Sequence, residues 1–253
     1  MENNSASPNS PALATSSHRK FPVGASVLAA LTGIPVLIVG GVVGGFVVSA
    51  LHGGHFNPRH ITIVDGLTIQ LFAYLALIPY LLWAMTKLWR VSLRDLGFRV
   101  PGGREIGIAL LGALGMILIV QGLAQIIQSV LHTQHEQQAV QLLKAVRSPG
   151  VLAFFAIFAI FIAPFVEELT FRVFIFGGAA RVAPVWAAAL LSGALFGAAH
   201  ADPIAFVPLA IGGMLLCIVY YRTRNAWMSM ISHAIFNGTT ILALLLAQRA
   251  GIH

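Results

Sequence analysis

The chain has 253 residues, of which 58% are hydrophobic and only 9% are charged. Soluble domains carry roughly a quarter of charged residues, so this composition excludes an ordinary globular protein, a disordered chain and a typical nucleic-acid binder. A mean hydropathy of +0.86 indicates that most of the chain lies in lipid.

Seven long stretches of the sequence lack Asp, Glu, Lys and Arg. A helix that crosses the hydrocarbon core needs about 20 mostly apolar residues. With their polar ends trimmed, these stretches predict spans at 23–51, 62–86, 106–131, 151–176, 185–200, 204–221 and 226–248. The alternation with a period of two that marks transmembrane strands is absent. We therefore predict an all-α polytopic membrane protein with about seven transmembrane helices.

The N-terminal end combines a polar tail with a long apolar run. Residues 1–18 are rich in Ser, Asn, Pro and Ala, which predicts a disordered tail. The apolar run that follows is much longer than the core of a signal peptide, about 7–15 residues, so it is expected to remain as the first helix. Its Gly40-x-x-x-Gly44 and Gly41-x-x-x-Gly45 repeats would allow another helix to approach closely.

The basic residues are distributed unevenly between the two sides of the predicted spans, and cytoplasmic loops of membrane proteins carry the excess. An N-terminus on the inside places ten cations on the inner side and four on the outer side. The inner ten are Arg19, Lys20, Lys87, Arg90, Arg94, Arg99, Arg104, Arg181, Arg222 and Arg224. The net charge of +7 is therefore interpreted as a signal of topology, with the N-terminus inside.

The loops carry little that indicates chemistry. One cysteine, Cys217, excludes an intrachain disulfide. Residues 87–104 are predicted as a basic inner loop, and 132–150 as an outer loop whose first part forms a short helix. Two groups of histidines are expected to be solvated, the first in a loop and the second on a helix face: His52, His55 and His60, and then His132 and His135.

Charged residues inside a membrane span are costly and indicate function by default. The fourth span continues into Glu167, Glu168 and Arg172. Glu168 and Arg172 are four residues apart and share a helix face, so the arginine can keep that carboxylate ionised. Glu167 points about 100° away and is free to act as a base. The alternative is a buried ion pair that only fixes helix packing.

Two later spans carry the other polar groups. Phe196 and His200 lie one turn apart, at the end of a helix face made thin by small residues. His233 and Asn237 are again four residues apart. An imidazole can move a proton or bind a metal, and an amide can donate to an oxyanion. In isolation, His200 also fits an interfacial residue, and the His233–Asn237 pair fits an interhelical hydrogen bond.

These three motifs, in this order, resemble the CPBP intramembrane proteases. That family includes the type II CAAX prenyl endopeptidases and the Abi proteins linked to bacteriocin self-immunity. The resemblance covers about residues 148–248, which would be the catalytic core. Residues 1–20 would then be an inner tail, 21–147 the N-terminal helices and 249–253 a tail. Many family members have eight spans, so residues 21–58 would hold two helices or one span is missing.

The resemblance implies a role for each motif residue. Glu167 would activate the hydrolytic water with help from His200, and Glu168 and Arg172 would organise the site. His233 and Asn237 would stabilise the tetrahedral oxyanion. If the family's enzymes bind a divalent metal such as zinc, the ligands here would be Glu167, or Glu168 in its place, together with His200 and His233. The implied partners are a peptide or membrane-protein substrate and the bilayer, with no nucleic acid, in a bacterial inner (plasma) membrane.

From the inner ends of their spans, Glu167 and His233 lie about 13 Å and 10 Å deep, and His200 about 22 Å, at 1.5 Å per residue. A convergent site then needs the fifth helix to tilt or to start deeper. Pro184, just before that helix, permits a break.

Motifs of other intramembrane proteases are incomplete. Ser192-Gly193 lacks the preceding glycine of Gly-x-Ser-Gly, and His135-Glu136 lacks the second histidine of His-Glu-x-x-His. A transporter is a third function to consider, but inverted repeats are absent from the sequence. The main alternative to a peptidase is a non-catalytic scaffold or immunity-type protein with the same fold.

Overall fold

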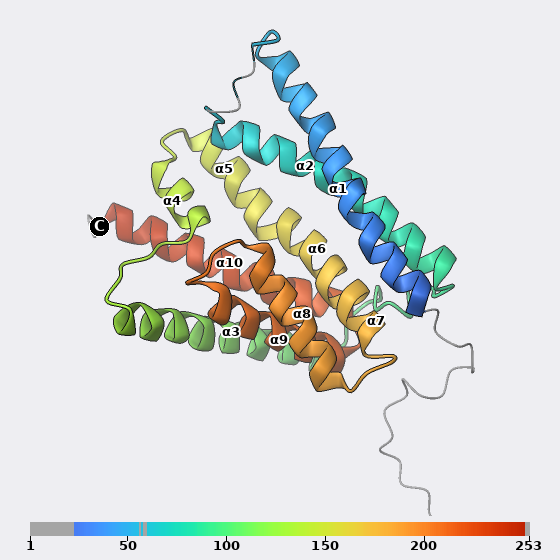
Figure 1. The fold of residues 1–253 in the computed structure, drawn as a ribbon. Helices are drawn as coiled ribbons and strands as arrows, with labels where there is room; N and C mark the ends of the chain where they lie inside the picture. The colour runs from blue at the N-terminus through green and yellow to red at the C-terminus, as the bar shows by residue number, and fades with distance from the viewer. Residues whose placement is uncertain (1–22, 56, 58–59, 251–253) are drawn as a thin grey trace, which may run out of the picture.

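Figure 1 shows the computed structural model, which describes residues 23–55, 57 and 60–250. The predicted disorder of residues 1–18 lies outside these residues. The described part is made of helices and loops and contains no strand, which confirms the all-α prediction. In chain order the elements are α1 (Val23–Leu51), α2 (Ile63–Trp83), η1 (Ala84–Leu88), α3 (Gly103–Val130), α4 (Gln138–Ala145), α5 (Pro149–Ile157), η2 (Phe158–Ile162), α6 (Ala163–Glu167), η3 (Glu168–Phe176), α7 (Gly177–Ala179), α8 (Val185–Ala199), α9 (Phe206–Thr223) and α10 (Ala226–Arg249), where η marks a π-helical segment.

Six helices in the described part are long and apolar enough to cross a membrane. The exception among the predicted spans is α8, with 15 residues, or about 22 Å at 1.5 Å per residue. Pro184 precedes it and His200 follows it, which are the boundaries expected from the sequence. The chain is thus an integral membrane protein with one shortened apolar helix, α8.

The first helix packs along α2 at one edge of the bundle (Figure 1). A Cβ atom on Gly40 would lie 2.7 Å from the Phe72 carbonyl oxygen, and one on Gly44 would lie 2.8 Å from Ile69 Cα. Gly45 has no atom within 4 Å of such a position. Of the two predicted glycine repeats, only Gly40-x-x-x-Gly44 forms the close helix contact.

A second glycine face joins α8 to α9. A Cβ atom on Gly193 would lie 2.5 Å from the Ala210 carbonyl oxygen, and one on Gly197 would lie 2.7 Å from that of Phe206. The two backbones approach this closely only because glycine has no side chain. This contact holds the helix that ends at His200 against α9, as the thin face in the sequence predicts.

At one end of the helices, polar contacts bind the loop before α3 to the α9–α10 turn. Arg99 donates to both Glu105 and the Thr223 carbonyl oxygen, and Asn225 Nδ2 donates to the Arg99 carbonyl oxygen at 3.1 Å. Gly97 has a φ of +94° there, and a Cβ atom on it would lie 2.7 Å from the Ala226 nitrogen. The basic loop at residues 87–104 is thus fixed to the start of α10.

The loop at residues 132–150 differs from its prediction. Its helix, α4, starts only at Gln138, so the expectation of a helix in the first part of the loop was wrong. His132 and His135 lie before it, outside any helix. His135 Nε2 lies 2.7 Å from Asp202 Oδ2, so it is paired with the α8–α9 turn rather than solvated on a helix face. The hydrogen bond forms between residues 67 positions apart, which local spacing cannot indicate.

Candidate active site

The two adjacent glutamates lie on one long, irregular helix that runs from Pro149 to Ala179. Its α-helical hydrogen bonds are interrupted twice, by the π-helical segments η2 and η3. Glu167 ends α6, and Glu168 begins η3. Segments of π-helix are uncommon and occur frequently at functional sites.

Glu168 forms a fully buried ion pair with Arg172. The distance from Arg172 Nη1 to Glu168 Oε1 is 3.2 Å, and both side chains are 0% exposed. The guanidinium carbon also lies 4.4 Å from the ring centroid of Phe196, and Nη2 donates to the Gly213 carbonyl oxygen at 3.4 Å. The arginine, with its Glu168 partner, therefore ties the glutamate helix to both α8 and α9.

His233 joins the glutamates from α10. Its Nδ1 lies 2.9 Å from Glu168 Oε1, and its Nε2 lies 3.7 Å from Glu167 Oε2. The imidazole therefore lies between the two carboxylates. The side chain of Glu167 is 19% exposed, whereas that of Glu168 is fully buried. Glu168 has two cationic or donor partners, and Glu167 is the carboxylate that water can reach.

His200 packs against Phe196 on its own helix, one turn earlier. Its Nδ1 is 2.8 Å from the Phe196 carbonyl oxygen, and its ring packs edge-on against Phe196 with centroids 4.8 Å apart. The Phe196 ring in turn lies 5.7 Å from that of His233. The side chain of His200 is exposed. The two histidines that were expected to face one site thus both pack against Phe196.

Asn237 contacts the glutamate helix two turns before the glutamates. Its Nδ2 donates to the Ala159 carbonyl oxygen at 2.8 Å. It lies one turn after His233 on α10, and its side chain is half-buried. The structure thus places Glu167, Glu168, Arg172 and His233 in one contact network and puts Asn237 beside it on the same two helices.

The described residues do not provide a complete ligand set for a metal ion. Structural and catalytic zinc sites take at least three protein ligands, and the described part holds no group of three His, Cys, Asp or Glu side chains in such an arrangement. Glu167 and His233 face each other, but His200 is turned to its own helix. This geometry does not fit the predicted zinc-like ion, so the mechanism below uses protein groups alone.

Several contacts at the site could not be seen in the sequence. Ser192 donates its hydroxyl to the Phe171 carbonyl oxygen at 2.7 Å, inside η3. Asp202 accepts from the backbone nitrogens of Ile204 and Ala205, which begin the turn into α9. Burial raises the pKa of Asp202, but the hydrogen bonds from His135 and from these two nitrogens outweigh it and hold the pKa below 3.8. Only the Asp-Pro pair after His200 offered a signal for this turn.

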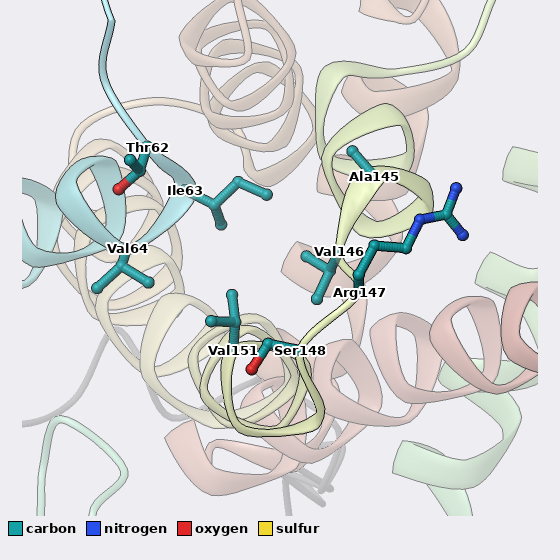
Figure 2. A pocket seen from close by; sticks show the side chains of 8 residues that line it. All are labelled: Thr62, Ile63, Val64, Ala145, Val146, Arg147, Ser148 and Val151. Atoms are coloured by element: carbon teal, nitrogen blue, oxygen red, sulfur yellow. The ribbon is translucent and has the colours of Figure 1, made fainter.

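A separate cavity of about 230 Å³ lies between the start of α2 and the link from α4 to α5. Figure 2 shows it, with the side chain of Arg147 extending away from the group formed by Thr62, Ile63 and Val151. Val151 precedes Glu167 by sixteen positions, about 24 Å along a helix. None of the candidate site residues lines this cavity.

Comparison with known proteins supports the resemblance seen in the sequence. Residues 149–239 match the family model described as type II CAAX prenyl endopeptidase Rce1-like. The chain is also similar to YdiL, a predicted membrane peptidase of Bacillus subtilis, with 29% identity over 84 residues, which are 33% of this chain and 34% of that protein. The similarity thus spans about a third of that relative. No solved structure matches the chain. Residues 149–239, which carry all the candidate site residues, are therefore the part of the chain that is similar to the Rce1-like type II CAAX prenyl endopeptidases.

Proposed function

We propose that this chain is an intramembrane endopeptidase in which Glu167 activates the water that cleaves a peptide bond. The observation that carries the proposal is the unequal environment of the two glutamates. Glu168 is buried against Arg172 and His233, while Glu167 is partly exposed beside the same imidazole. A pair of carboxylates in different environments is suited to different tasks, one structural and one in proton transfer.

In the proposed reaction, Glu167 takes a proton from water as the oxygen attacks the carbonyl carbon of the scissile bond. The carbonyl oxygen becomes an oxyanion, which His233 and an N–H of Asn237 would stabilise by hydrogen bonding. Glu167 then returns its proton to the leaving amine as the carbon–nitrogen bond breaks. Glu168 and Arg172 touch no reacting atom in this scheme, but they hold His233 and Glu167 in place.

The substrate would be a peptide or a membrane protein that reaches the site from the bilayer or its edge. Most of the described residues lie in helices that are long and apolar enough to cross a membrane, and a hydrophobic substrate segment would be soluble in the same phase. The matched family description names CAAX prenyl endopeptidases. A peptide that ends in a prenylated cysteine and three further residues is therefore the first defined probe. We place the protein in a bacterial inner membrane with its N-terminus inside.

The test compares membrane proteomes and released peptides from cells that carry the wild type, Glu167→Ala or Glu136→Ala. Glu136 is the matched control, because it pairs with Lys144 outside the candidate site. We expect one or more proteins to accumulate uncleaved with Glu167→Ala and to be processed normally with Glu136→Ala. If cells without the chain differ from the wild type but Glu167→Ala does not, the chain acts as a scaffold and the proposal is wrong.

A further inference from the structure

One carbonyl group in the glutamate helix has no hydrogen-bond donor within that helix. The two donors that could reach the Ala159 carbonyl oxygen are the N–H groups four and five residues later. The N–H of Ala163 donates to Phe158 instead, because η2 has π-helical bonding. The next residue is Pro164, which has no N–H at all. Proline and the π-helical segment together leave this carbonyl without a helical partner.

Asn237 supplies the missing donor from α10. Its Nδ2 lies 2.8 Å from the Ala159 carbonyl oxygen, within the normal range for such a bond. A backbone carbonyl without a partner is strongly unfavourable inside a bilayer, so this bond stabilises the contact between α10 and the glutamate helix. The contact lies one turn along α10 from the contacts of His233 with Glu167 and Glu168.

We propose that Pro164 is a positioning residue for the candidate active site. Because Pro164 has no N–H, the Ala159 carbonyl group accepts its hydrogen bond from Asn237 instead. The bond fixes the plane of the Asn237 amide and the position of α10 along the glutamate helix. It thereby aims the other N–H of the same amide and keeps His233 between the glutamates. The alignment of the amide and of His233 for catalysis rests on the proposed peptidase function. The replacement of a helical donor by Asn237 does not.

A double-mutant cycle tests whether Asn237 replaces the helical donor to the Ala159 carbonyl group. The full chain is used in detergent micelles, and the measured quantity is the apparent midpoint of thermal unfolding at one scan rate. Asn237→Ala should lower the midpoint by a few degrees, on the order expected for one lost hydrogen bond in a chain of this size. In the Pro164→Ala background the same change should cost almost nothing, because the new N–H restores a helical donor. An equal cost in both backgrounds would overturn the proposal.

Pro79→Ala provides the matched background, because Pro79 also lies inside a membrane helix but in α2, away from Asn237. There, Asn237→Ala should cost as much as in the wild type. Should Pro164→Ala fail to fold, Pro164→Val restores the same N–H with a side chain close to proline in volume. The cycle needs no substrate, so its result stands whether or not the peptidase proposal holds.

The positioning step is tested with an internally quenched peptide that ends in a prenylated cysteine and three residues. Pro164→Ala should lower kcat at least about tenfold and leave KM within about twofold, as expected when a group that acts in the transition state is misaligned. Pro79→Ala should leave both constants near their wild-type values. An unchanged kcat for Pro164→Ala, with the thermal coupling present, would make the contact purely structural. If the wild-type protein leaves the peptide intact, the proposed cleavage of this substrate is wrong. The replacement of the helical donor by Asn237 is then still decided by the thermal midpoints.

Discussion

His233 Nε2 lies 3.7 Å from Glu167 Oε2 while the other nitrogen of the same ring lies 2.9 Å from Glu168 Oε1. The two glutamates are adjacent in the sequence, and like charges this close repel each other. One imidazole between them, with Arg172 beside the second, reduces that repulsion. The arrangement explains how a membrane helix can hold two consecutive carboxylates.

Glu168→Gln and Arg172→Lys should each abolish most of the activity and destabilise the fold. Removing one partner of a buried ion pair costs about 3–5 kcal/mol, because the other charge is left buried. A lysine keeps the charge but lacks the planar group that faces Phe196. Cleavage of the quenched peptide and thermal midpoints are the measurements. Full activity in both variants would remove the pair from the site.

His233→Ala should reduce activity far more than His200→Ala. His233 lies within 4 Å of both glutamates, whereas the contacts of His200 are with Phe196. We expect a loss of at least about a hundredfold for His233, in the range of a lost donor to the oxyanion. The assay is the initial rate at saturating peptide. Equal losses would mean that His200 moves toward Glu167 when substrate binds.

The His135–Asp202 pair should make stability depend on acid pH. The pKa of Asp202 is lower in the fold than its ordinary value of 3.8. Its stabilising effect is therefore complete above that value and is lost as the pH falls through the lower folded pKa. Asp202→Asn should flatten the fall in thermal midpoint below about pH 4 relative to wild type. Identical pH profiles for the two proteins would contradict this role.

Gly40→Leu should destabilise the protein, and Gly45→Leu should not. A side chain on Gly40 would collide with the backbone of α2, whereas the space beside Gly45 is open. Overpacking of this kind costs about 1–3 kcal/mol. Thermal midpoints of the two variants measure the difference. Comparable losses in both would mean that a partner covers the Gly45 face as well.

The proposed topology predicts that residues 92 and 134 lie on opposite sides of the membrane. Ser92→Cys and Gln134→Cys place single thiols at exposed positions, in a background in which Cys217 is replaced by alanine. A membrane-impermeant maleimide should label position 134 in intact cells, and position 92 only after the membrane is permeabilised. Labelling of both positions in intact cells would refute the orientation.

The sequence alone determined the features that depend on neighbours along the chain. Charge-free stretches predicted the six long apolar helices of the described part, because crossing the bilayer requires about 20 apolar residues. They also predicted the shorter α8. The contact of Glu168 with Arg172 was predictable because residues four apart share a helix face. The sequence predicted that a glycine repeat in the first helix would form a close helix contact. It did not predict which of the two repeats, and the structure shows that it is Gly40-x-x-x-Gly44.

Only the tertiary structure decided how residues far apart in sequence meet. His135 pairs with Asp202 and Asn237 with Ala159, across 67 and 78 positions. No periodic pattern records such pairs, because they depend on how antiparallel helices are aligned and on where π-helical segments change the direction of side chains. The same dependence brings His200 and His233 each into contact with Phe196. Three motifs in order could identify the residues of a site, but the distances among them follow from helix packing.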